Sequence, residues 1–301
     1  MAYKEIKALK NRRRDFALAK REEVMYNISN LISVTHERYG NIMTALELVN
    51  KLCEKDALTA EGTADTFKTG DPYVEVSKVA LCFIATPDVI KEAAAWGAEL
   101  IITHEPTFYH HWDEMPPYEI AKKKRELIES LGVTLFRYHD HPHVSFPGRD
   151  LFSEGFVEAM GWKGVYEDAL NFVLDEAMTP REMVRQMEEK LDVHHLRVAG
   201  DVDTPTRRVA LLLGARGGEW NTFINSPEEG VGIGGEVCEW AICEAARDAA
   251  QFGIQKTVIV MGHAASERDG MKYITDMVKE KFALAGIEFR YFESGETFTT
   301  L

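Results

Sequence analysis

Residues 87–104 read PDVIKEAAAWGAELIITH, and the order of elements in this stretch decides the fold. Its first part is predicted as a helix, opened by Thr86-Pro87 and closed at Gly97. A short, mainly apolar run follows and ends in His104. Runs of this kind are typical of strands that are buried on both faces of a sheet. The stretch therefore predicts a helix and then a buried strand whose end carries a histidine.

The same order of helix, glycine, apolar strand and histidine occurs twice more along the chain. One copy closes its helix at Gly132 and leads through VTLFRYHDHPH, residues 133–143. The other closes its helix at Gly253 and leads through IQKTVIVMGHAASE, residues 254–267. A further apolar strand, SKVALCFIAT, precedes the first copy. This alternation predicts an α/β fold with mostly parallel sheets, in which ligands bind beyond the carboxyl ends of the strands.

Composition favours a globular protein with a small-molecule ligand. The chain has 301 residues, 45% of them hydrophobic, and a mean hydropathy of -0.24. A formal net charge of -14 argues against nucleic-acid binding, because a polyanion would be repelled. The basic segment KALKNRRRDFALAKR, residues 7–21, is interpreted as a solvated helix face or arm.

Cysteine spacing and hydropathy bear on the cellular location of the protein. The four cysteines show no CxxC spacing, and the N-terminus lacks the apolar core of a secretory signal, so we expect a cytoplasmic protein. The chain has no uninterrupted run of 18 apolar residues, so we expect no membrane span.

The histidines at the strand ends, together with nearby carboxylates, form a candidate ligand set of nitrogen and oxygen donors without thiolates. Its members are His104, Glu105, His139, Asp140, His141, His143, His263 and Glu267. Such donors suit Zn, Fe, Mn or Co in a catalytic site. Because eight candidates exceed the needs of one ion, we expect two divalent ions about 3.5 to 4 Å apart.

The spacing of His263 and Glu267 places both on one face of a helix, if a helix starts directly after the strand. Ser266 is expected to help cap that helix. The remaining histidines receive other interpretations: His110 and His111 as a lid or surface packing, and His194 and His195 as structural or solvent-facing.

At AELIITHEP and GHAASE the chain resembles the dinuclear metal-centre family named after an Ngg-interacting factor (Nif3-like), whose members often carry the name GTP cyclohydrolase I type 2. The resemblance covers roughly residues 44 to 301. Within that family two strand-end histidines, a middle His and Asp, and a Gly-His-x3-Glu motif bind two metal ions. His104, His263 and Glu267 match these positions.

Two departures from the family pattern bear on the metal ligands. Glu105 stands where the second histidine of the pair usually lies, and HDHPH at residues 139–143 replaces His-x3-Asp. Three alternatives stay open for the metal ligands of the second segment: His139 with His143, His141 with Ser145, or Asp140. We favour His139, Asp140 and His143 as ligands. A segment that resembles a family stretch adds Glu236 and Glu239 as secondary candidates.

The resemblance implies two related α/β halves, with the metal site at strand carboxyl ends between them, in a ring-like homohexamer. We expect a helical extension at 1–43, a first half at 44–165 with His104 and the 139–143 cluster, and a second half at 166–301 with His263 and Glu267. Thr179-Pro180 is expected to open a helix of the second half. The glycine-rich LLLGARGGEW, residues 211–220, is interpreted as a tight turn rather than a phosphate cradle.

Two classes of function fit these residues. One is a metal-dependent hydrolase of a small nucleotide-like or phosphate-bearing substrate, with Glu105 or Glu236 as the catalytic carboxylate that moves protons. The other is a metal-binding adaptor or regulatory protein that forms a ring and turns nothing over. A barrel-shaped binuclear hydrolase ranks last, since it needs more repeating units than the chain shows.

Overall fold

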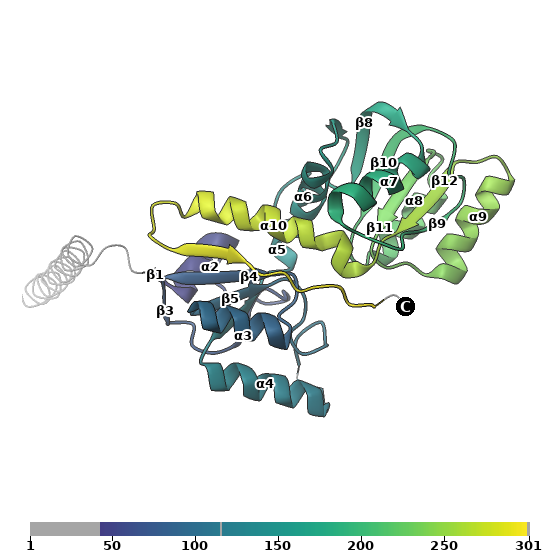
Figure 1. Ribbon diagram of the computed structural model, residues 1–301. Helices are drawn as coiled ribbons and strands as arrows, with labels where there is room; N and C mark the ends of the chain where they lie inside the picture. The colour runs from purple at the N-terminus through teal and green to yellow at the C-terminus, as the bar shows by residue number, and fades with distance from the viewer. Residues whose placement is uncertain (1–42, 115, 300–301) are drawn as a thin grey trace, which may run out of the picture. The chain divides into compact units, whose positions relative to one another are not determined.

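A computed structural model describes residues 43–114 and 116–299 of the chain. The predicted helical extension at 1–43 lies almost wholly outside the described residues, and so does the basic segment 7–21. Residues from Thr44 onward form one compact unit. Two open sheets with helices packed on them make up this unit, which confirms the α/β class and is not a closed barrel (Figure 1).

The first sheet has the strand order β13-β4-β5-β6-β2. Its parallel strands are β4 (Lys78–Cys82), β5 (Leu100–Thr103), β6 (Thr134–Arg137) and β13 (Glu288–Tyr291), and β2 (Phe67–Thr69) is antiparallel to β6. The residues of β5 and β6 are all buried, as their continuous apolar runs predict. Short strands β1 (Met43–Thr44) and β3 (Glu75–Val76) lie outside both main sheets.

Helices α3 (Pro87–Trp96) and α4 (Glu119–Leu131) connect the parallel strands of the first sheet. The Thr86 side chain accepts a hydrogen bond from Val89 N and so caps α3, which ends at Gly97 in the left-handed conformation. Gly132 ends α4 in the same way. Helix α2 (Ala45–Cys53) precedes this sheet along the chain and begins with a capping box at Thr44.

The second sheet has the order β7-β8-β10-β11-β12-β9. Its central strands β10 (Thr206–Leu212), β11 (Gly230–Gly234) and β12 (Lys256–Val260) are parallel. Antiparallel strands flank them: β7 (Gly164–Tyr166) and β8 (Asn171–Met178) on one side, and β9 (Arg197–Ala199) on the other. Helix α7 (Pro180–Leu191) starts at Thr179 with a capping box, as the Thr-Pro pair predicts.

Two further helices follow strands of the second sheet. Helix α8 (Gly217–Asn225) follows β10, and α9 (Glu244–Gln251) is preceded by a π-helical turn at Glu239–Cys243. The helix predicted to end at Gly253 is therefore present, but its first turn, Glu239–Cys243, is a π-helical turn, which is wider than a turn of α-helix.

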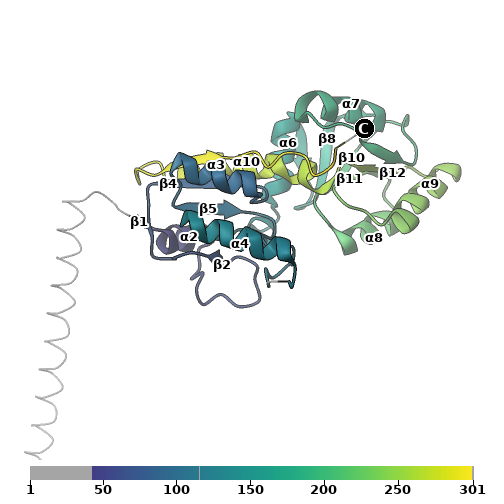
Figure 2. The same cartoon turned by 60° about the horizontal axis from the view of Figure 1, so that its bottom comes forward.

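Helix α10 (His263–Lys281) starts three residues after β12 and leads back to the first sheet, where β13 pairs with β4 (Figure 2). It packs against α6 (Leu151–Met160) and against β13 and β4. The proposed boundary near residue 165 stays a prediction, but the last strand of the chain belongs to the sheet of the first half.

Candidate metal centre

The predicted histidine segments follow the carboxyl ends of three strands. His104 comes directly after β5, and His139 lies two residues beyond the end of β6. His263 is the first residue of α10, which follows β12. Because β5 and β6 are adjacent parallel strands, their ends meet at one edge of the first sheet.

Two groups of three side chains bring their donor atoms within 4.8 Å of one another. One group contains His104, His139 and His143, and the other contains His104, Glu105 and Glu267. The rings of His104 and His139 are stacked, with centroids 4.6 Å apart. Because both groups share His104, they form one continuous cluster of donors.

His263 adds a further nitrogen to this cluster. Its Nε2 lies 3.1 Å from Glu267 Oε2, one helical turn along α10, and 3.4 Å from Glu105 Oε1. The helix does start directly after the strand, so the i, i+4 spacing places both side chains on one face as expected. The expected cap by Ser266 is wrong: its hydroxyl donates to His263 O and accepts from Gly214 N.

Each of the four histidines has its Nδ1 next to an acceptor, which leaves Nε2 for the cluster. The acceptors are Tyr138 O at 3.1 Å for His104, Asp140 Oδ1 at 2.7 Å for His139, Asp150 Oδ2 at 2.8 Å for His143, and Glu236 Oε1 at 2.8 Å for His263. Metal-binding histidines in proteins are usually held in this way, because the Nδ1–H bond fixes the tautomer and the direction of the ring.

This geometry bears on two predicted site residues, Asp140 and Glu236. The second oxygen of Asp140 accepts hydrogen bonds from Thr63 Oγ1 and Ala64 N, both at 2.8 Å, so the carboxylate lies behind His139. Glu236 is mostly exposed and lies behind His263. Both carboxylates are therefore placed to orient histidines. Glu239 instead pairs with Arg197.

Two buried atoms of the cluster have no hydrogen-bond partner: His104 Nε2 and Glu267 Oε2. Leaving such atoms unpaired in the interior costs roughly 1 to 3 kcal/mol each. A cation bound between them would satisfy both, and imidazole nitrogen with carboxylate oxygen is the donor set of Zn, Fe and Mn sites. The residues present therefore fit a metal ion.

The charges in the cluster are strongly coupled. Burial disfavours ionisation of Glu105, but a hydrogen bond with His263 and the neighbouring histidine charges lower its pKa to about 2. Burial likewise opposes the charge on His263, yet the facing carboxylates of Glu105 and Glu267, 3.4 and 3.1 Å from its Nε2, raise its pKa to about 11. In this geometry the positive charge of a protonated His263 offsets the negative charge of the facing carboxylates. A bound metal ion would supply that positive charge instead.

The HDHPH segment is held by Asp65, which the sequence alone did not single out. The carboxylate of this fully buried residue accepts hydrogen bonds from the backbone N–H groups of His139, Asp140 and His141. The segment thereby forms the short helix α5 (Asp140–Val144), which turns His143 back towards His104. No local signal in the sequence connects residues 74 positions apart.

The glycine-rich segment after β10 is a turn that approaches the cluster closely. Gly214 has a φ of +71°, and a Cβ there would lie 2.3 Å from Glu267 Oε1. Only glycine fits this position without moving the carboxylate. The segment is thus a tight turn, as interpreted from the sequence, and its glycine leaves room for the Glu267 carboxylate.

The remaining histidines lie at different distances from the cluster. His111 is exposed, contacts His139 edge to face, and lines the cavity over the cluster. His141 packs between Tyr138 and Phe146, and no metal-holding group among the described residues includes it. His194 and His195 are exposed just before β9.

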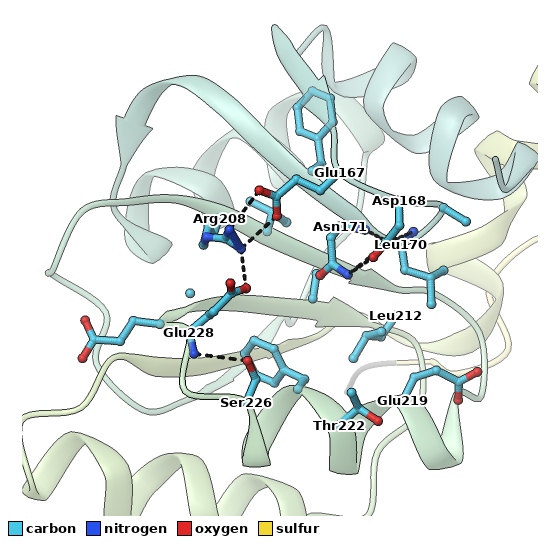
Figure 3. Close-up of a pocket in the computed structure, with 17 residues that line it drawn as sticks. Glu167, Asp168, Leu170, Asn171, Arg208, Leu212, Glu219, Thr222, Ser226 and Glu228 are labelled. Carbon is cyan, nitrogen blue, oxygen red and sulfur yellow. Dashed lines mark hydrogen bonds and ion pairs between the residues drawn. The ribbon is translucent and has the colours of Figure 1, made fainter. Parts of the chain in front are cut away.

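A cavity of about 650 Å³ opens onto the cluster, large enough for a small-molecule ligand. Its wall carries the cationic side chains of Lys55, Arg137 and Arg216 as well as the metal-ligand candidates. A second cavity of about 410 Å³ lies by β8, β10 and α8 (Figure 3). There Arg208 pairs with Glu167 and Glu228, and none of the lining residues belongs to a metal-holding group among the described residues.

Comparison with known proteins assigns the fold to a family. The model of the family described as Duf34/NIF3 (NGG1p interacting factor 3) matches residues 41–297. The chain belongs to this family. Solved structures agree: Staphylococcus aureus protein SA1388 is 17% identical with a TM-score of 0.67, and covers 86% of this chain and 99% of its own. A Bacillus cereus protein related to NIF3 is 15% identical with a TM-score of 0.67, over 87% and 99% of the two chains.

Curated Duf34/NIF3 relatives carry the name GTP cyclohydrolase 1 type 2 homolog. The protein from Clostridium perfringens is 26% identical over 157 residues, which are 48% of this chain and 59% of the relative. The protein from Streptomyces coelicolor is 23% identical over 190 residues, 59% and 65% of the two chains. The chain thus spans about three fifths of the length of the curated relatives that it matches.

Proposed function

We propose that the protein is a dinuclear metal-dependent hydrolase that acts on a small nucleotide-like or phosphate-bearing substrate. The observation that supports this proposal is the convergence of four histidines and two carboxylates, with every Nδ1 held by an acceptor. His104 offers one nitrogen and so would bind one ion, whereas the carboxylates of Glu105 and Glu267 could bridge that ion to a second one held by the remaining histidines. We propose His104, Glu105, His139, His143, His263 and Glu267 as the direct ligands, with Asp140 behind His139.

When bound, such ions polarise a substrate oxygen and lower the pKa of water to near neutrality. The chain's own residues would do the rest. Glu105 lines the cavity and stays ionised, which suits a ligand better than a base. Glu236 is exposed beside His263 and is the carboxylate that would move a proton to solvent. Lys55 and Arg216 on the cavity wall would attract an anionic substrate.

Elemental analysis of the purified full-length protein tests the metal centre. We expect about two equivalents of a transition metal per chain, and no more than trace metal in a variant that combines His104→Ala with His263→Ala. Trace metal in the wild-type protein, unchanged by these substitutions, would contradict the proposal. Circular dichroism of the variant provides the control for folding.

Activity is tested separately. Hydrolysis of nucleotides and phosphate esters is measured with and without a chelator, and formate release from GTP tests the reaction that the relatives' name describes. We expect metal-dependent turnover of at least one such substrate. A protein that retains two ions and turns over none of them would instead be a metal-binding adaptor or regulatory protein. Light scattering then tests the expected homohexamer.

A further inference from the structure

Among the three histidines of the cluster that are held by a carboxylate, His143 has the most deeply buried partner. Its Nδ1 lies 2.8 Å from Asp150 Oδ2, and the Asp150 side chain is only 1% exposed. The carboxylates behind His139 and His263 are 28% and 61% exposed. A hydrogen bond to a buried carboxylate is less weakened by water than a bond at the surface.

Asp150 is itself held from two further directions. Its Oδ1 accepts hydrogen bonds from Phe152 N at 2.9 Å and Ser153 N at 3.1 Å, which caps helix α6. Its Oδ2 accepts a hydrogen bond from Arg216 Nη2 at 2.5 Å, from the glycine-rich turn after β10. The carboxylate is thus fixed by a helix start and by a cation at the same time.

The contacts around Asp150 decide the tautomer of His143. An ionised carboxylate can only accept, so Asp150 Oδ2 accepts a hydrogen bond from His143 Nδ1 and another from Arg216 Nη2. Arg216 Nη2 also lies 2.9 Å from His143 Nδ1, farther than from the carboxylate oxygen. With the proton on Nδ1, the lone pair of Nε2 faces the cluster. The Phe152 ring stacks on His143 with centroids 4.7 Å apart and holds the imidazole plane.

We infer that Asp150 and Arg216 are positioning residues for the metal centre, which keep His143 in the Nδ1–H tautomer and thereby set the affinity for one of the two ions. This inference rests on the proposed metal centre. It adds two residues that bind neither ion directly. It also assigns a role to the turn at residues 214–217, because Arg216 in that turn balances the charge of the buried Asp150 carboxylate.

The substitution Asp150→Asn tests the inference, because asparagine caps helices as well as aspartate does. The amide nitrogen would then face His143 Nδ1 and force it to accept, which moves the proton to Nε2. We expect affinity for one ion to fall roughly 10- to 100-fold, measured by titrating metal-free full-length protein with Zn²⁺ against a chromophoric chelator. Affinity for the other ion should stay unchanged.

Asp168→Asn is the matched control. Asp168 likewise accepts from backbone N–H groups two and three residues ahead, Leu170 N and Asn171 N, but it lines the other cavity. We expect this variant to bind metal like the wild type. Arg216→Gln should weaken the same ion as Asp150→Asn, and Arg216→Lys should restore part of the affinity. Equal affinities in all variants, or an equal loss in the Asp168 control, would overturn the inference.

Nitrogen-15 NMR of the imidazole rings in metal-free protein separates this inference from the proposed function. We expect the Nδ1–H tautomer for His143 in the wild type and the Nε2–H tautomer in Asp150→Asn. If the tautomer changes but neither protein binds metal, the proposed function fails and the positioning of His143 stands. If the tautomer is the same in both proteins, the inference fails whatever the metal content.

Discussion

Glu105 stands where the resemblance noted in the sequence leads us to expect a second histidine. Its Oε1 lies 3.4 Å from His263 Nε2 and 3.7 Å from His104 Nε2. Together with Glu267 it places two acidic groups against the histidines, with the Glu267 side chain buried and that of Glu105 14% exposed. An oxygen-richer donor set favours Mn or Fe over a site built mainly from imidazole.

The substitution Glu105→Gln tests this residue directly. An uncharged amide oxygen is a poor ligand, so we expect the metal content to fall from two equivalents to about one. Glu105→His should retain both ions and shift the preference towards Zn, as measured by competition between Zn²⁺ and Mn²⁺. Glu114→Gln, an exposed glutamate in the following loop, serves as the control. An unchanged metal content in Glu105→Gln would remove Glu105 from the ligand set.

Lys124 in α4 gives a second prediction, independent of metal. The residue is only 4% exposed, and burial lowers its pKa to about 8. Since the folded pKa lies below the unfolded value, the folded state binds fewer protons between about pH 8 and 10.5, and stability rises with pH there. Below pH 8 the charge is buried at full cost.

We therefore expect Lys124→Met to stabilise the protein at pH 7 by roughly 1 to 3 kcal/mol. The advantage over the wild type should shrink as the pH rises towards 10.5. Urea unfolding at several pH values measures it. Lys122→Met, on the exposed side of the same helix, should show no such pH dependence. A constant difference between Lys124→Met and the wild type would contradict the prediction.

At the scale of elements, the packing of α6 against α10 brings together residues of the candidate metal centre. Helix α10 carries His263 and Glu267, and the N-terminus of α6 carries Asp150 and Phe152. Glycines allow the close approach of the two helices: a Cβ on Gly155 would lie 2.7 Å from Gly270 Cα. A Cβ on Gly270 would lie 2.9 Å from Phe152 Cα.

We expect Gly155→Ala and Gly270→Ala each to destabilise the protein by roughly 1 to 3 kcal/mol, because the added methyl group forces the helices apart. Thermal unfolding and metal titration should both respond, since the separation also displaces Phe152 from His143. Gly217→Ala in α8 is the matched control, because a Cβ there meets nothing within 4 Å. Equal melting temperatures for the three variants would contradict this role of the glycines.

At the scale of the whole molecule, the candidate metal ligands come from segments that lie far apart along the chain, from His104 to Glu267. A metal ion bound by these donors would therefore tie together β5, α5 and α10, and anything that binds only the folded state stabilises it. No helix among the described residues is long and apolar enough to cross a membrane.

Removal of metal should accordingly lower the melting temperature. At a free metal concentration of 100 times Kd each bound ion adds about 2.7 kcal/mol to the free energy of unfolding. Differential scanning calorimetry with and without chelator measures the change. The variant with His104→Ala and His263→Ala should melt at the same temperature in both conditions. A chelator effect of equal size in that variant would show that the stabilising metal lies elsewhere.

Local patterns sufficed for most elements and for the regions of the site. Helix α3 was predicted at both ends because Thr86 and Gly97 act through hydrogen bonds within a few residues of themselves. Strands β5, β6 and β12 follow from the sequence because a strand buried on both faces is mostly apolar, although β6 ends in the buried Arg137 and β12 begins with the buried Lys256. The rule that ligands gather at strand carboxyl ends led to His104, His139 and His263.

The sequence by itself thus determined the α/β class, the helix ends and the chemical nature of the donors. Only the tertiary structure decided that β13 returns to the first sheet, that Asp65 holds the HDHPH segment, and that Asp150 meets Arg216 across 66 residues of chain. The physical reason is the range of the interactions. Caps and apolar runs act between near neighbours, whereas a buried carboxylate acquires its partners only when distant segments pack together.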